Sequence, residues 1–172
     1  MKAAQVDLVE GKPRLVVGQA PEPLPAPGEL LVAVRAIGVN RADLLLRPDH
    51  FQSFPARERP PIPGIEAAGE VVGLGAGVDG FAIGDRVAGL TPGAYAERVA
   101  MPAGLAWRVP PALDWVQAAS LPLAVCTAHD ALTGSGRLQR GDAVAVLGAT
   151  TSVGRIAIAL ARQLGAAEVV GT

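Results

Sequence analysis

The chain has few residues that can form cross-links or bind metals. Its 172 residues include one cysteine and two histidines. A single cysteine excludes an internal disulfide and any multi-cysteine zinc site within one chain. It is also typical of a reducing compartment, so we expect a cytoplasmic protein.

Charge of one sign and long apolar runs are lacking as well. The formal net charge is −1 and no basic run is present, so nothing favours a nucleic-acid partner. No segment reaches about 18 uninterrupted apolar residues, which predicts no membrane-spanning helix. Residues 1–11 contain acidic side chains and no apolar signal core. We therefore expect neither a nucleic-acid partner nor a membrane partner.

Glycine, proline and apolar residues are abundant. The chain has 21 glycines and 15 prolines, spread along its length, and half of its residues are apolar. This distribution indicates many turns and not disorder. The length suits one domain, or one domain plus a piece of another.

Residues 1–120 are predicted to form an antiparallel β domain. Residues 40–46 are expected to form one or two helical turns, and the polar loop 49–63 has a size that usually carries function. The apolar patterns and the turn residues between them predict strands or turn-plus-strand segments at 2–9, 14–19, 29–38, 63–75, 81–90 and 93–99.

The last thirty residues have the pattern of a dinucleotide-binding unit. Residues 144–147 read as a buried strand, 148–154 as a small-residue turn, 156–164 as a helix and 168–172 as a second strand. Residues 121–172 are therefore predicted to be the start of a Rossmann domain, with a boundary near 115–125. Because such a domain needs further strands, we expect it to be incomplete and C-terminally truncated.

Seven ordered motifs carry a family resemblance. The chain resembles the zinc-independent quinone oxidoreductase branch of the medium-chain dehydrogenase/reductase (alcohol dehydrogenase-like) superfamily. The resemblance implies a mixed fold, with a GroES-like antiparallel β-barrel catalytic domain at 1–120 followed by the first βαβ unit of a Rossmann fold. The motifs are residues 38–43, 63–69, 84–87, 93–97, 118–122, 127–128 and the terminal glycine turn.

The resemblance also implies a reaction. It implies hydride transfer from NADPH to a quinone or an activated C=C acceptor. The choice between NADP and NAD stays open, because the 2′ position is read about 20 residues beyond the glycines, past Thr172. Zinc-dependent relatives place ligands at the positions of Asn40, Ile65 and near Leu123, and none of these can ligate zinc, so no metal is expected.

Several site residues follow from the resemblance, although none is identified as catalytic. Asn40 and Thr127 are expected near the nicotinamide end of the cofactor, and Asp43 and Phe51 in the substrate pocket. The phosphate-binding turn is expected to use Gly148, Ala149, Thr151, Ser152, Val153 and Gly154. Relatives usually carry glycine in place of Thr151 or Ser152, whose Cβ atoms would crowd a phosphate or whose hydroxyls would donate to it.

Each of these residues also has a purely structural interpretation. Asn40 and Thr127 could cap helices. Asp43 and Glu66 could be backbone anchors or members of a buried ion pair, with Arg41 or Arg47 as the partner.

Three functional hypotheses remain open from the sequence. The first is the quinone oxidoreductase, and the second is an enoyl reductase of the same superfamily. The third is a non-catalytic fragment or binding module, because a single βαβ unit leaves a sheet edge unpaired. Its exposed apolar faces would then seek a partner, with a second copy of the chain as a possible homo-oligomer. We expect the isolated chain to be inactive in NADPH oxidation and to bind nucleotide weakly at best.

Overall fold

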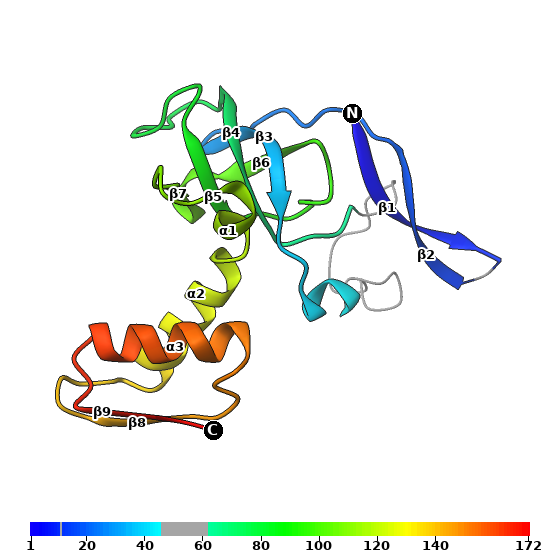
Figure 1. Cartoon of the computed structure of the whole chain (residues 1–172). Coiled ribbons are helices and arrows are strands. Elements are labelled where there is room, and N and C mark those ends of the chain that lie inside the picture. Colours follow the sequence, from blue (N-terminus) through cyan, green and yellow to red (C-terminus); the bar gives the residue numbers. More distant parts are fainter. Residues whose placement is uncertain (11, 46–61) are drawn as a thin grey trace. The chain divides into compact units, whose positions relative to one another are not determined.

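The structure is a computed structural model that describes residues 1–10, 12–45 and 62–172 (Figure 1). The chain divides into two compact units, Met1–Pro122 and Leu123–Thr172. Within the described ranges, no helix combines the length and apolar character that crossing a bilayer requires.

The first unit begins with a β-hairpin. Strands β1 (Lys2–Val9) and β2 (Lys12–Gln19) pair antiparallel, from Lys2 opposite Gln19 to Val9 opposite Lys12. The second strand begins two residues earlier than predicted, because the backbone at 12 and 13 still pairs with β1.

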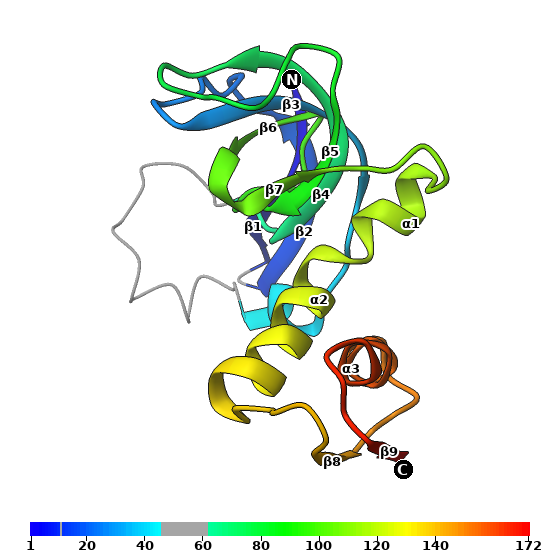
Figure 2. The same cartoon turned by 90° about the vertical axis from the view of Figure 1, so that its left-hand side faces the viewer.

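A five-stranded antiparallel sheet forms most of the first unit. Its order is β6-β3-β4-β5-β7, and Figure 2 shows these strands curling around a common centre. The GroES-like antiparallel fold predicted for this region is confirmed. The strands are β3 (Glu29–Ile37), β4 (Glu66–Leu74), β5 (Arg86–Leu90), β6 (Arg98–Pro102) and β7 (Ala106–Arg108), with the short 3₁₀ turn η3 (Ala103–Leu105) before β7.

The two faces of this sheet bury different sets of residues. Adjacent residues alternate between the faces, as a strand requires, so Ala67 contributes to one cluster and Ala68 to the other. Helix α1 (Trp115–Ala119) packs on the second face through Ala118 and Ala119. The capping box of Asp114 and Gln117 starts this helix. The first cluster consists of Leu30, Val32, Ala67, Val71, Val87, Ala94, Val99 and Met101.

The prediction of one strand over 93–99 is wrong for its first five residues. Regular pairing begins only at Arg98, opposite Ala33 of β3. The preceding segment instead bonds to the residues that lead into β4: the N–H of Tyr95 donates to the carbonyl of Pro63 at 2.9 Å, and that of Gly93 to Gly64 at 3.0 Å. Residues 93–97 therefore form a separate connection beside the start of β4.

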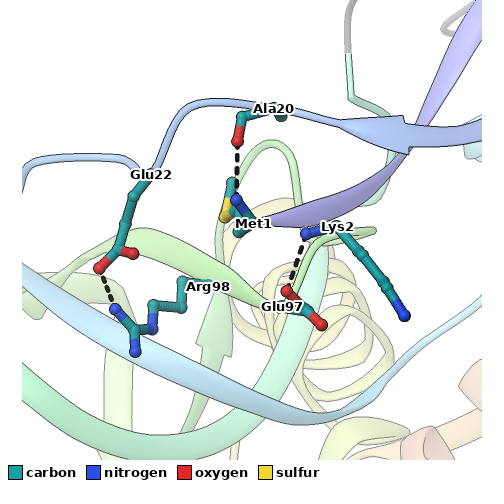
Figure 3. A network of polar contacts seen from close by, with 6 residues as sticks. All are labelled: Met1, Lys2, Ala20, Glu22, Glu97 and Arg98. Carbon is teal, nitrogen blue, oxygen red and sulfur yellow. Dashed lines mark hydrogen bonds and ion pairs between the residues drawn. The ribbon is translucent and has the colours of Figure 1, made fainter.

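Strand β1 holds this connection from its other side. The Lys2 backbone N–H donates to Glu97 Oε2 at 2.7 Å, and the Ala4 N–H donates to the Tyr95 carbonyl at 2.8 Å. Figure 3 shows the Lys2–Glu97 contact together with the neighbouring ion pair of Arg98 and Glu22. The 95–98 segment is thus fixed by hydrogen bonds to two separate parts of the unit.

The second unit contains the βαβ arrangement. Strands β8 (Ala143–Val146) and β9 (Glu168–Gly171) pair in parallel, and helix α3 (Ser152–Gln163) connects them. The predicted strand–turn–helix–strand order is confirmed, although the helix begins four residues earlier than expected. The cluster at its centre contains Ala128, Leu132, Val146, Ala157 and Ala161.

A helical segment precedes this βαβ arrangement. Helix α2 (Pro122–His129) continues into the π-helical turn η4 (Asp130–Ser135). The helix therefore begins five residues before Thr127, the residue that was considered as a helix cap.

Candidate functional site

Asn40 follows β3 and precedes the 3₁₀ turn η1 (Arg41–Leu45). Its Nδ2 donates to Oε1 of Glu66 at 2.6 Å. Glu66 starts β4 and is only 3% exposed. An ionised carboxylate only accepts hydrogen bonds, so the NH₂ group of Asn40 must face Glu66. Oδ1 of Asn40 is left as an acceptor to which no described residue donates.

Asp43 joins Asn40 to a distant tyrosine. Its Oδ2 accepts from the Asn40 backbone N–H at 2.7 Å and from the Tyr95 hydroxyl at 2.9 Å. Its Oδ1 is buried and has no hydrogen-bond partner among the described residues. The interpretation of Asp43 as a backbone anchor is confirmed. Arg47, one of the two arginines considered as its partner, lies outside the described residues.

The helix-cap interpretation of Asn40 is wrong. Its side chain is used by Glu66, and the carboxylate that bonds to a backbone N–H at this turn belongs to Asp43. In this turn, the side chain of Asp43 therefore accepts from the backbone N–H of Asn40, three residues before it.

Tyr95 was not among the residues that the sequence singled out for the site. It is the only tyrosine in the chain. Burial, followed by the hydrogen bond to Asp43 and the negative charges of Asp43 and Glu66, raises its pKa to about 12. The phenol is therefore a stable donor to Asp43 over the physiological range. Its place within the family motif at 93–97 was the signal that could have identified it.

Two motif glycines make room for this cluster. A Cβ on Gly38 would lie 2.0 Å from Oε1 of Glu66 and 2.5 Å from its Cγ. A Cβ on Gly64 would lie 2.5 Å from the Tyr95 ring, and its φ of +99° is also unfavourable for other residues. Glycine at these positions lets the carboxylate and the ring approach the backbone. We call Asn40, Asp43, Glu66 and Tyr95 the Asn40 network.

The turn between β8 and α3 is built around close backbone contacts. Gly148 has a φ of +73°, and a Cβ on Gly154 would lie 2.2 Å from the Gly148 carbonyl oxygen. The Thr151 hydroxyl donates to that same carbonyl at 2.8 Å and accepts from the Gly154 N–H at 3.1 Å. Thr151 is thus the N-cap of α3, and its hydroxyl is used within the turn, not left for a phosphate.

The first turn of α3 presents free backbone donors. No described residue accepts from the N–H groups of Ser152 and Val153, which are the first two of the helix. Such groups carry the partial positive charge of a helix N-terminus and are suited to bind an anion. Ala149 is held differently, because its N–H donates to the Thr172 carbonyl at 2.9 Å.

The remaining predicted site residues are Thr127 and Phe51. Thr127 lies inside α2 and is exposed, so its interpretation as a helix N-cap is wrong. Phe51 lies outside the described residues. Asn40 and Asp43 are brought together in the first unit, whereas Thr127 and the 148–154 turn belong to the second.

A metal-binding group is not formed by the described part of the chain. There, no three side chains of histidine, cysteine, aspartate or glutamate gather in a way that could hold an ion. Asp43 and Glu66 both bond to Asn40, Asp43 at its backbone N–H and Glu66 at its side-chain amide.

Comparisons with known proteins agree with this architecture. The sequence model of the alcohol dehydrogenase GroES-like domain matches residues 26–111. An alcohol dehydrogenase superfamily protein from Novosphingobium aromaticivorans superposes with a TM-score of 0.87 at 36% identity, over 99% of this chain and 52% of that one. The quinone oxidoreductase of Thermus thermophilus, solved also in complex with NADPH, gives 0.75 at 32% identity, over 99% and 52%.

Much larger proteins contain a similar sequence. A mycocerosic acid synthase-like polyketide synthase of Mycobacterium tuberculosis is 41% identical over 143 residues, which are 83% of this chain and 7% of the synthase. The chain thus spans about half the length of the similar solved structures and a small part of this synthase.

Proposed function

Because the chain belongs to the alcohol dehydrogenase GroES-like domain family, we propose that it is part of an NADPH-dependent oxidoreductase acting on a quinone or an activated C=C acceptor. The observation that carries this proposal is the β8–α3–β9 unit, whose helix begins with two free N–H groups, on the same chain as the GroES-like domain. The Thermus thermophilus enzyme, a quinone oxidoreductase that binds NADPH, supports the choice of cofactor and acceptor.

The turn at 148–154 fits the pyrophosphate of a dinucleotide. Gly148 and Gly154 bring the backbone close together, and Ser152 and Val153 supply N–H donors at a helix N-terminus. Thr151 shapes this turn as the N-cap. When bound, NADPH would supply the hydride, and the chain would hold and orient it.

By the family resemblance, we propose Asn40 and Thr127 as contacts of the nicotinamide end. The amide oxygen of Asn40 offers an acceptor for a ligand N–H or O–H group, since its NH₂ is already used by Glu66. Thr127 offers an exposed hydroxyl on α2. We also propose Asp43 and Phe51 as residues of the substrate pocket. Asp43 would act indirectly, through its hydrogen bonds to the Asn40 backbone and the Tyr95 hydroxyl.

We propose that the reaction proceeds without zinc. Asn40 and Ile65 lack the thiolate and imidazole that the metal needs, and Asn40 bonds to Glu66. Without a Lewis acid, the acceptor must already be electrophilic, as quinones and conjugated C=C bonds are.

A second candidate is an enoyl reductase. The observation that favours it is the 41% identity to part of a polyketide synthase. The two candidates share the cofactor and the Asn40 network and differ only in the acceptor.

The proposal is tested by titrating the chain with NADPH, following the fluorescence of the reduced nicotinamide and recording the molecular mass in solution. We expect the chain alone to bind weakly at best, and a longer protein that contains it to show saturable binding, with NADH as the comparison cofactor. An ortho-quinone and an α,β-unsaturated thioester then separate the two acceptors in a longer protein that contains the chain, whereas the chain alone is expected to turn over neither. No binding by a folded chain of either length would overturn the nucleotide site.

A further inference from the structure

We propose that Tyr95 is a positioning residue for Asn40 and acts through Asp43. The inference rests on the proposed function, because Asn40 matters there as a ligand contact. It adds a residue, from a different part of the chain, that decides how Asn40 is presented.

The first step is the shared oxygen of Asp43. One atom, Oδ2, accepts both the Tyr95 hydroxyl at 2.9 Å and the Asn40 backbone N–H at 2.7 Å. Two donors on one oxygen fix the carboxylate plane, whereas one donor leaves it free to rotate. Oδ1 does not compensate, because it is buried without a partner in the described part of the chain. Removal of the tyrosine hydroxyl therefore loosens Asp43 and, through it, the backbone of Asn40.

The second step is the opposite end of Asn40. Glu66 holds its NH₂ group at 2.6 Å, so two carboxylates fix this residue, one at the backbone and one at the side chain. With both contacts made, the side-chain oxygen Oδ1 of Asn40 is held in one orientation. If the backbone contact is lost, the side chain must follow the Glu66 bond alone, and the direction of Oδ1 is no longer defined.

The third step is the rigidity of Tyr95 itself. Its N–H donates to Pro63, and its carbonyl accepts from Ala4 of β1. Its ring lies against Gly64, where a Cβ would come within 2.5 Å. A donor held at both backbone ends and along its ring is suited to position another group.

The test compares Tyr95→Phe with a matched control, Thr91→Val. Phenylalanine keeps the ring and loses only the hydroxyl. Thr91 lies in the same unit, is 2% exposed and donates to the Ala100 carbonyl at 3.1 Å, so the control also removes one buried hydroxyl but leaves the Asn40 network intact. Asn40→Ala and the double variant Tyr95→Phe/Asn40→Ala complete a double-mutant cycle.

The first readout needs no cofactor. In a ¹⁵N NMR spectrum of the chain, the side-chain NH₂ signals of Asn40 are assigned by their absence from Asn40→Ala. We expect Tyr95→Phe to shift or broaden them, and Thr91→Val to leave them in place. Unchanged Asn40 signals in folded Tyr95→Phe would overturn the positioning role, whatever the chain binds.

The second readout is the NADPH dissociation constant. Tyr95→Phe should weaken binding by roughly fivefold, the size of one ordinary hydrogen bond. It should cause no further loss when Asn40 is already alanine, whereas additive losses would mean that Tyr95 acts independently of Asn40. If neither the wild-type chain nor a longer protein that contains it binds NADPH, the proposed function fails, while the NMR comparison still decides the inference.

Discussion

The Tyr95 hydroxyl donates to Oδ2 of Asp43 at 2.9 Å, across 52 residues of sequence. The bond ties η1 to the connection that precedes β6. Asp43 is also the residue that receives the Asn40 backbone N–H. A side chain proposed to contact the cofactor is therefore supported by a residue from a distant connection of the same unit.

We expect this bond and the burial of the ring to raise the pKa of Tyr95, the single tyrosine of the chain. Phenolate absorbance in the near ultraviolet reports Tyr95 alone, and we expect its midpoint at about 12, above the ordinary value of 10.0. Because the folded state has the higher pKa, its stabilising contribution is fully present below pH 10 and is lost as the pH rises toward 12. A midpoint at the ordinary value in the folded chain would contradict the burial and the bond.

Asp43→Asn separates the causes of that shift. The amide removes the negative charge but keeps an oxygen that can accept from the phenol. We expect the Tyr95 pKa to fall only part of the way, because burial is the largest cause and remains. A return of the pKa to its ordinary value would show that the carboxylate, and not burial, dominates.

Gly38→Ala should disturb the Asn40 network from the backbone side. The new Cβ would meet the Glu66 side chain at 2.0 Å and push its carboxylate away from Asn40. We expect a loss of about 1–3 kcal/mol in the free energy of unfolding, measured with urea. Gly104→Ala is the control, because nothing lies within 4 Å of its Cβ position. Equal effects of the two substitutions would argue against a specific contact.

Ser152→Pro should remove one anion donor without breaking α3. Proline is favoured at the first helical position, and Thr151 before it already has an extended backbone with ψ of 163°. We expect about a tenfold or greater loss in NADPH affinity, the size of a charge-assisted hydrogen bond. Ser152→Ala, which keeps the N–H and loses the hydroxyl, should bind like the unaltered chain. Weakening by alanine alone would assign the contact to the hydroxyl.

Thr151→Ala should weaken the start of α3. It removes the acceptor of the Gly154 N–H and the donor to the Gly148 carbonyl. We expect a loss of about 1 kcal/mol in the stability of the second unit, seen as faster amide exchange at 152–154. Thr151→Ser keeps the hydroxyl and should retain most of the protection. If serine is as damaging as alanine, the methyl group and not the cap is responsible.

The βαβ unit could be predicted because its signals are local. An apolar run, a small-residue turn and an apolar helix follow one another within thirty residues, and the structure has them in that order. The start of the helix was placed at Ile156, because the capping role of Thr151 depends on a turn geometry that composition does not show.

The start of α2 was misplaced for a related reason. Thr127 was one candidate for the first residue of a helix, but the helix already begins at Pro122. Proline fits the first turn of a helix as well as it fits a loop, so the same residue supports both interpretations.

By itself, the sequence determined the order of the elements in the βαβ unit and the family, and by resemblance it predicted site roles for Asn40 and Asp43. The tertiary structure decided which groups these residues meet. The antiparallel register that sets Ile37 opposite Ala67 brings the Gly38–Asn40 segment beside Glu66, and the 93–97 connection brings Tyr95 to Asp43. Such a register depends on the packing of both sheet faces at once, and no local pattern around residue 40 or 95 contains that information.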